Sequence, residues 1–167
     1  LGLDNDIFCF NVESAVELEI INELAAAKNK VASIALRINP EVDAHTHAKI
    51  TTGMKENKFG INLSQLGGVL DKLKEMKNVK LIGIHSHIGS QITDMSSFRN
   101  LVIRFNEIQE ELEAHGVTVE NLNFGGGLGI DYYHPNHLSI PAFDNYFAAI
   151  HKLLQVRPGQ QVHFEPG

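Results

Sequence analysis

The stretch "VKLIGIHSHIGSQI", residues 79–92, joins an apolar run to a polar end that contains glycine. Residues 79–86 are rich in Val, Leu and Ile without strict polar alternation, which is typical of a strand covered on both faces in a parallel sheet. The sequence therefore predicts a buried strand here. Four other segments have the same character and are also predicted as strands: 6–12, 31–38, 117–124 and 160–165.

Amphipathic segments lie between these runs and predict helices that alternate with the strands. This order implies right-handed crossovers and a parallel α/β sheet, and by itself it allows either a doubly wound sheet or a barrel. The connection 39–62 has no clear periodicity, and long connections of this kind are usually functional or mobile. The expected helix starts are a capping box at Ser14 and Glu17, then Ser64, Asp94, and the pair Ser139 and Pro141.

Composition limits the possible partners and compartments. The chain has 167 residues, 43% hydrophobic and 20% charged, with a formal charge of −6, so nucleic acid and anionic membranes are not expected as main partners. It contains neither an apolar run of the ~20 residues that cross a bilayer nor a signal peptide. The single cysteine, Cys9, excludes an internal disulfide and fits a cytoplasmic protein. Neither end resembles a domain boundary, so we expect a fragment of a larger protein.

Polar or glycine-rich residues follow four of the five predicted strands. The strand ends read "LRINP" (36–40), "HSHIGSQ" (85–91), "NFGGGLG" (123–129) and "HFEPG" (163–167). In parallel α/β folds the ligand binds at the carboxyl ends of the strands. The coincidence at four ends predicts an active site there.

The glycine run at 125–127 could turn its backbone N–H groups toward an anion such as phosphate. It is not a dinucleotide fingerprint, because Ile130 stands where that pattern requires glycine. A tight turn of a barrel is the alternative interpretation. Ser90 could add a hydroxyl donor to the same phosphate, although serine after glycine is also common turn chemistry.

Glu165, at the end of the last predicted strand, is either a solvated or capping carboxylate or a ligand for a cationic group. Opposite a pyridine ring it would keep the ring nitrogen protonated, which makes the ring a better electron sink.

Histidine pairs at His45/His47 and His85/His87 have a spacing that permits two metal ligands on one strand face. Further ligands would have to come from a loop that holds Asp131, His134 and His137. A planar imidazole packed against an aromatic ring is the competing use, and we expect no metal.

Taken together, these motifs resemble those of the diaminopimelate decarboxylases, pyridoxal-phosphate enzymes of the last lysine-forming step. "LRINPEVDAHTHAKITTG…KFGI", "HSHIGSQI", "NFGGGLGIDY" and "EPG" occur in order with suitable spacing over essentially the whole chain. The wider group includes ornithine and arginine decarboxylases and resembles alanine racemase in its barrel.

The resemblance implies roles for individual residues. His87 would stack on the cofactor ring, and Glu165 would pair with the pyridine nitrogen; these two are the expected catalytic residues. Ser90 and the glycines would bind the phosphate, Arg37 would lie near the cofactor, and His85 would be a strand residue behind His87. The full set of implied cofactor-binding residues is Arg37, His87, Ser90, Gly125, Gly126, Gly127, Glu165, Pro166 and Gly167.

The resemblance also implies what surrounds this chain. Residues 1–167 would be a partial pyridoxal-phosphate-binding (β/α)₈ barrel of the alanine racemase type, about strands four to eight of eight. The N-terminal barrel strands, with the lysine that holds the cofactor, and the C-terminal β domain would be absent, so this chain alone is expected to be inactive. The parent would be a cytoplasmic homodimer that decarboxylates meso-2,6-diaminopimelate to L-lysine. The alternatives are a non-catalytic pyridoxal-phosphate-binding barrel, a decarboxylase of another basic amino acid, and a metal-dependent barrel hydrolase.

Overall fold

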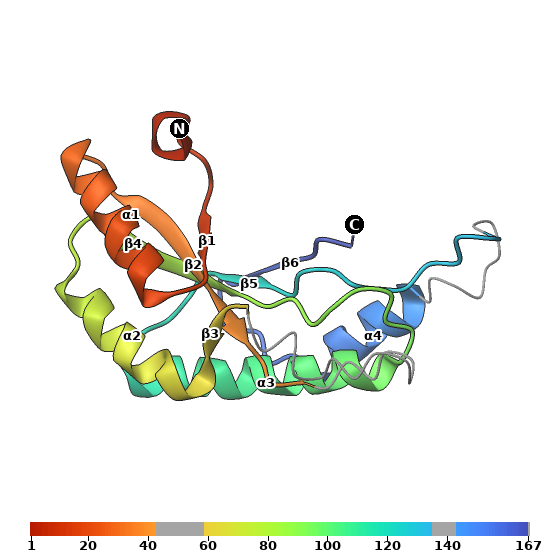
Figure 1. The fold of residues 1–167 in the computed structure, drawn as a ribbon. Coiled ribbons are helices and arrows are strands. Elements are labelled where there is room, and N and C mark those ends of the chain that lie inside the picture. Colours follow the sequence, from red (N-terminus) through yellow and green to blue (C-terminus); the bar gives the residue numbers. More distant parts are fainter. Residues whose placement is uncertain (43–58, 135–142, 167) are drawn as a thin grey trace.

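The structure, a computed structural model, describes residues 1–42, 59–134 and 143–166. These residues form a parallel α/β arrangement, as the sequence predicts (Figure 1). The helices are the 3₁₀ helix η1 (Gly2–Asp4), α1 (Ala15–Ala27), α2 (Leu63–Glu75), α3 (Met95–Ala114) and α4 (Phe143–Leu153). The strands are β1 (Phe10–Val12), β2 (Ala32–Asn39), β3 (Ile61–Asn62), β4 (Val79–His85), β5 (Asn121–Asn123) and β6 (Gln161–His163).

Strand order follows chain order. The sheet runs β1-β2-β4-β5-β6 with every pairing parallel, and β3 pairs with β2. A doubly wound sheet reverses its order at a switch point, whereas these strands continue in one direction. Right-handed crossovers in one direction put successive helices on the same face. Figure 1 shows α2, α3 and α4 together along one side of the strands, with both chain ends on the other side.

Three of the predicted strands are too long at their ends. The segments 6–12, 117–124 and 160–165 shorten to the three-residue strands β1, β5 and β6. For the second of these the cause is local, because the backbone N–H of Val117 bonds to the carbonyl of Leu112 at 2.9 Å and completes the end of α3. The backbone N–H of Val117 is therefore used by the helix end and is not available to a neighbouring strand.

The short strand β3 lies at the end of the 39–62 connection, where no strand is predicted. Its residues pair with Ile38 and Asn39, beyond the point where β1 leaves β2. It therefore takes the place of β1 along the carboxyl end of β2. Two residues are too few to give a recognisable strand pattern in the sequence.

The start of α1 agrees with the predicted capping box in one of its two bonds. Ser14 Oγ accepts a hydrogen bond from the Glu17 backbone N–H at 3.1 Å. The Glu17 carboxylate accepts from the backbone N–H of Glu13 at 2.7 Å, one residue earlier than the predicted partner. The helix therefore has an N-terminal cap, and its second bond is made to the end of β1.

The starts of α2 and α3 give one wrong and one correct prediction. Helix α2 is capped by Asn62, whose N–H donates to Gln65 Oε1 at 3.4 Å, so Ser64 lies inside the first turn. For α3 the prediction is confirmed, because Asp94 Oδ1 accepts from the Ser96 N–H at 2.9 Å. The predicted start at Ser139 and Pro141 lies outside the described residues.

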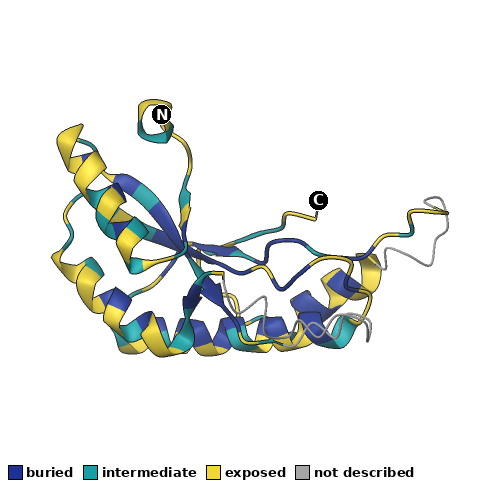
Figure 2. Cartoon of the chain, in the orientation of Figure 1, coloured by how far each residue is buried: buried dark blue, intermediate teal, exposed yellow. Residues whose placement is uncertain are grey.

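The main core lies between the helices and the face of the sheet that they cover (Figure 2). Phe124, directly before the glycine run, stacks on Phe105 of α3 with ring centroids 4.1 Å apart, and both side chains are buried. This contact anchors the start of the glycine turn to a helix. In the described part of the chain, no helix is both long and apolar enough to cross a bilayer.

Candidate active site at the carboxyl ends of the strands

A row of polar side chains crosses the sheet near the carboxyl ends of its strands. Arg37 of β2 is in register with His85 of β4, His85 with Asn123 of β5, and Asn123 with His163 of β6. Residues in register on neighbouring strands point to the same face. The neighbouring row, Leu36, Ile84 and Leu122, is buried in the core on the other face.

The carboxylate of Glu165 lies at the end of this row. Asn123 Nδ2 donates to its Oε1 at 2.7 Å, and His85 Nε2 lies 4.0 Å from its Oε2. The Glu165 backbone N–H also donates to the carbonyl of Gly125 at 2.7 Å. Its side chain remains 57% exposed, so the carboxylate is held by the fold and is accessible to a ligand.

Asn123 joins two parts of the site. Its Nδ2 holds Glu165, while its Oδ1 accepts a hydrogen bond from the backbone N–H of Gly125 at 2.9 Å. One amide side chain therefore links the carboxylate after β6 with the glycine turn after β5. The sequence analysis missed this residue, although its place before the glycine run was a usable signal.

His85 is the most deeply buried of the polar groups in the site, with a side chain only 6% exposed. Burial lowers the pKa of His85 to about 4; the negative charge of Glu165 opposes this shift and the positive charge of Arg37 adds to it. The imidazole is therefore neutral at pH 7. Its Nδ1 is buried and has no hydrogen-bond partner among the described residues.

Arg37 is held by a carboxylate that the sequence analysis did not single out. Its Nη1 donates to Glu13 Oε1 at 2.6 Å, and Glu13 Oε2 accepts from the Gly60 backbone N–H at 3.3 Å. The guanidinium also lies 5.5 Å from the ring centroid of Phe59. Glu13 directly follows β1, so the fifth strand end is polar like the other four and could have been read in the same way.

His87 lies beyond the end of β4 and is exposed. Its Nδ1 accepts a hydrogen bond from the backbone N–H of Gly126 at 3.3 Å. The two histidines of the predicted pair thus have different surroundings, one buried beside Glu165 and one exposed beside the glycine turn. His85 is a residue of β4, as expected, and the role of His87 as the wall of a cofactor site stays a prediction.

Backbone packing explains the glycine run. A Cβ on Gly126 would lie 1.9 Å from the carbonyl oxygen of Glu165, and one on Gly127 would lie 2.1 Å from that of Gly89. Gly127 also has a φ of +103°, which L side chains rarely adopt. The segments after β4, β5 and β6 therefore touch through their backbones, and this close packing by itself requires glycine at positions 126 and 127.

The loop after β4 is fixed to the loop after β5 by Gln91. Its Nε2 donates to the Ile130 carbonyl at 3.1 Å, and its Oε1 accepts from the Ile130 N–H at 2.9 Å. Ser90, the preceding residue, is exposed. The structure thus brings Ser90, His87 and the glycine turn to one rim, as predicted, and adds Gln91, which the sequence analysis missed.

Some of the predicted residues cannot be placed. Pro166 follows Glu165 and is exposed, but Gly167 lies outside the described residues, as do His45, His47 and His137. Asp131 Oδ2 lies 3.4 Å from His134 Nδ1 on an exposed loop. The described ranges contain no group of three or more His, Cys, Asp or Glu side chains arranged to hold a metal ion.

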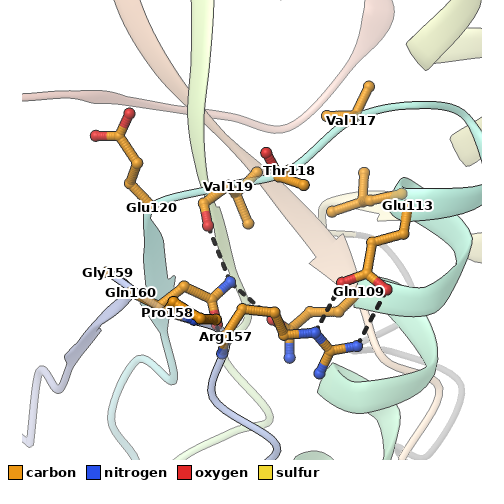
Figure 3. Close-up of a pocket in the computed structure, with 11 residues that line it drawn as sticks. Gln109, Glu113, Val117, Thr118, Val119, Glu120, Arg157, Pro158, Gly159 and Gln160 are labelled. Carbon is orange, nitrogen blue, oxygen red and sulfur yellow. Dashed lines mark hydrogen bonds and ion pairs between the residues drawn. The ribbon is translucent and has the colours of Figure 1, made fainter.

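Two cavities border β5, one along the polar face of the strand and one before its amino end. One, of about 340 Å³, opens on the polar face and is lined by Asn123, His163 and Glu165 among others. The other, of about 370 Å³, lies at the amino end of β5 beside α3 (Figure 3). There Arg157 pairs with Glu113 at 2.7 Å, and Gln160 Nε2 donates to Gln109 Oε1 at 2.8 Å. The candidate site is the first cavity and the rim beside it.

These features define an α/β domain with a parallel sheet and a polar site at the carboxyl ends of its strands, the position at which such domains bind ligands. The sequence profile described as pyridoxal-dependent decarboxylase, pyridoxal binding domain, matches residues 2–167. The chain belongs to this family of pyridoxal-binding domains.

Individual relatives agree with this assignment. The chain is 60% identical over 167 residues to a diaminopimelate decarboxylase of Bacteroides thetaiotaomicron, covering all of this chain and 43% of that protein. It is 41% identical to the Haemophilus influenzae diaminopimelate decarboxylase over 99% of this chain and 39% of that protein. A crystal structure of Helicobacter pylori diaminopimelate decarboxylase complexed with L-lysine matches with a TM-score of 0.85 and 34% identity, over 99% of this chain and 41% of that one. The chain thus spans about two fifths of the length of these relatives.

The residues present fit the cofactor that the family binds. A held but accessible carboxylate suits a protonated pyridine nitrogen, an exposed planar imidazole suits an aromatic ring, and a glycine turn can offer backbone N–H groups to a phosphate. Glu165 and His87 present the first two kinds of group at one rim. In the glycine run the N–H groups of Gly125 and Gly126 donate to Asn123 and His87 in this structure, so a phosphate would have to compete with these acceptors.

Proposed function

We propose that this chain is the cofactor-binding part of a diaminopimelate decarboxylase, which converts meso-2,6-diaminopimelate into L-lysine and CO₂. The observation that carries the proposal is the 60% identity to the Bacteroides thetaiotaomicron enzyme along the whole chain. Because the chain spans 43% of that relative, the activity is proposed for the whole protein.

Glu165 has the central electrostatic role in this proposal. When bound, pyridoxal phosphate supplies an electron sink for the carbanion left by loss of CO₂. The Glu165 carboxylate, oriented by Asn123, stabilises the protonated pyridine nitrogen on which that sink depends. A fixed carboxylate needs little reorganisation during the reaction, which is why its hydrogen bond to Asn123 belongs to the mechanism.

The rim around Glu165 positions the ring and the phosphate. When the cofactor is bound, His87 would lie against the ring, and Ser90 with the amides of Gly126 and Gly127 would hold the phosphate. Gly125, Pro166 and Gly167 would be further cofactor-binding residues, and Arg37, fixed by Glu13, adds positive charge beside the site. This arrangement is supported by the contacts among the loops after β4, β5 and β6.

We also propose that the chain alone is inactive. In the part of the chain that the structure describes, the lysines belong to helices or lie near the amino ends of strands, away from Glu165. Lys72 and Lys74 are in α2, Lys152 is in α4, and Lys80 is the second residue of β4. None of these positions matches the motif of the lysine that holds the cofactor in the family.

The wider architecture follows the same proposal. The strands described here correspond to about strands four to eight of an eight-stranded barrel of the alanine racemase type. The whole protein is a cytoplasmic homodimer. Light scattering on the full-length protein measures the dimer directly, and a monomeric mass at working concentration would reject it.

A decarboxylation assay on the full-length protein tests the function. CO₂ release is measured with meso-diaminopimelate, ornithine, arginine and lysine, and we expect turnover of the first only. Glu165→Gln should lower kcat more than tenfold, whereas Glu120→Gln, which changes an exposed carboxylate before the amino end of β5, should not. Preferential turnover of another substrate would assign a different decarboxylase. Bound cofactor without turnover of any substrate would assign a non-catalytic binding protein.

A further inference from the structure

His85 occupies an unusual position for a neutral, buried imidazole. Its side chain is only 6% exposed, its Nε2 faces the Glu165 carboxylate at 4.0 Å, and its Nδ1 has no partner among the described residues. A buried polar nitrogen without a hydrogen bond is costly, so native proteins rarely keep one without a reason. The family resemblance assigns no role to this residue beyond lying behind His87.

The surroundings determine which nitrogen carries the proton. A neutral imidazole has one N–H donor and one lone-pair acceptor. A lone pair on Nε2 would be repelled by the negative Glu165 oxygen that it faces. An N–H group at Nε2 is attracted to the same oxygen. The Nε2–H tautomer is therefore favoured, and it leaves Nδ1 as a buried acceptor.

Two residues of neighbouring strands then face the two oxygens of one carboxylate. Asn123 of β5 donates to Glu165 Oε1 at 2.7 Å, and His85 of β4 presents its Nε2 toward Oε2. His85 and Asn123 are in register, so both are fixed by the sheet ladder. Groups on strands hold a functional side chain more rigidly than groups on loops.

We propose that His85 is a positioning residue for Glu165: as the Nε2–H tautomer it orients the carboxylate through Oε2, while Asn123 holds Oε1. The inference deepens the proposed function and rests on it for the consequence in catalysis. The alternative is that His85 only fills space in the interior.

The first experiment uses the full-length protein without cofactor. Long-range ¹⁵N–¹H correlation spectra of the histidine-labelled protein distinguish the two tautomers of each imidazole. We expect His85 as the Nε2–H tautomer at pH 7. An Nδ1–H tautomer would overturn the proposal. Since this result does not depend on pyridoxal phosphate, it stands or fails separately from the proposed function.

A titration of the same spectra tests the electrostatic contact. The charged or titratable groups that act on His85 are Glu165, Arg37, His87 and Glu13. Glu165→Gln should lower the titration midpoint of His85, and Arg37→Met should raise it. Glu120→Gln, which removes an exposed carboxylate near Lys80, is the control and should leave the His85 midpoint unchanged. An unchanged His85 midpoint in Glu165→Gln would overturn the contact.

The second experiment uses the full-length enzyme loaded with cofactor. Glutamine can place an N–H near the former Nε2, whereas leucine fills the space without a donor. We expect His85→Leu to lower kcat about tenfold with KM within twofold, and His85→Gln to retain at least a third of kcat. If both variants fold and lose kcat to the same extent, the proposal is overturned and His85 only fills space. Should His85→Leu fail to fold, the tautomer and titration measurements decide the proposal.

Discussion

The backbone amide of Gly126 donates a hydrogen bond to Nδ1 of His87 at 3.3 Å. This bond connects the imidazole proposed to face the cofactor ring with a glycine proposed to bind the cofactor phosphate. One N–H cannot serve both acceptors fully, so phosphate binding must weaken or replace its bond to His87. The contact also explains how His87 is oriented although its side chain is exposed.

Titration with pyridoxal phosphate should therefore change the amide resonance of Gly126 together with the imidazole resonances of His87. The measurement is a series of ¹⁵N–¹H spectra of the 167-residue chain at increasing cofactor concentration. Gly159, in a turn before β6 at the other end of the sheet, serves as the control and should not shift. Shifts confined to residues near Gly159 would place binding at the wrong end of the molecule.

Gly126→Ala should destabilise the fold by at least about 3 kcal/mol, because its Cβ would lie 1.9 Å from the Glu165 carbonyl oxygen. Gly68→Ala is the matched control. Gly68 lies within α2, where an added methyl group would have no neighbour within 4 Å, so alanine there should add roughly 0.5–1 kcal/mol. Urea unfolding of both variants gives the two free energies. Similar stability of both variants would show that the loop after β6 can move away from the turn.

Ser90→Ala separates phosphate binding from folding better than a change in the glycine run. Valine at Gly127 would place its Cβ 2.1 Å from the Gly89 carbonyl oxygen, so lost cofactor there could reflect a damaged fold. Ser90 is exposed, and its removal should leave stability within ~0.5 kcal/mol. Loss of one hydrogen bond should weaken cofactor binding by about 1 kcal/mol, or up to ~3 if the bond is charge-assisted. Equilibrium dialysis measures this change, and an unchanged affinity would remove Ser90 from the phosphate site.

The lowered pKa of His85 predicts how stability depends on pH. Its pKa of about 4 in the folded protein lies below the ordinary histidine value of 6.5, so between these pH values the unfolded chain binds more protons. The free energy of unfolding should therefore fall as pH decreases through this window, by about 2 kcal/mol between pH 7.5 and 5 from this group. Urea unfolding at both pH values, for the wild type and His85→Gln, isolates the contribution. A parallel decrease in both proteins would assign the pH dependence to other groups.

Glu13→Gln should loosen the Arg37 side chain, because an amide cannot form the ion pair that now joins them at 2.6 Å. Glu13 is partly exposed, so solvent screening limits the expected loss to about 1 kcal/mol. The control is Asp71→Asn, which removes an exposed ion pair with Lys74 within α2 and should have no measurable effect. Urea unfolding compares the two, and equal effects would show that Glu13 contributes no more than a surface charge.

Much of this architecture is readable in the sequence because the relevant signals are local. The apolar runs predicted a parallel sheet, Asp94 marked the start of α3, and the polar strand ends indicated one rim. These features depend on neighbouring residues and on the burial of a single segment. Predictions failed where one or two residues had to be assigned without a longer pattern around them, as with the strand β3 and the N-terminal cap of α2.

What the sequence alone determined is therefore the order of strands and helices and the chemical character of the rim. The partners within the rim were decided only by the tertiary structure: Glu13 with Arg37, and Asn123 and His85 with Glu165. The physical reason lies in the strand register. Between Ile34 and Ala35 the pairing of β2 with β4 shifts by one residue, which puts Arg37 opposite His85. Without that shift Arg37 would lie opposite the buried Ile84, because a slip of one residue moves side chains to the other face of a sheet.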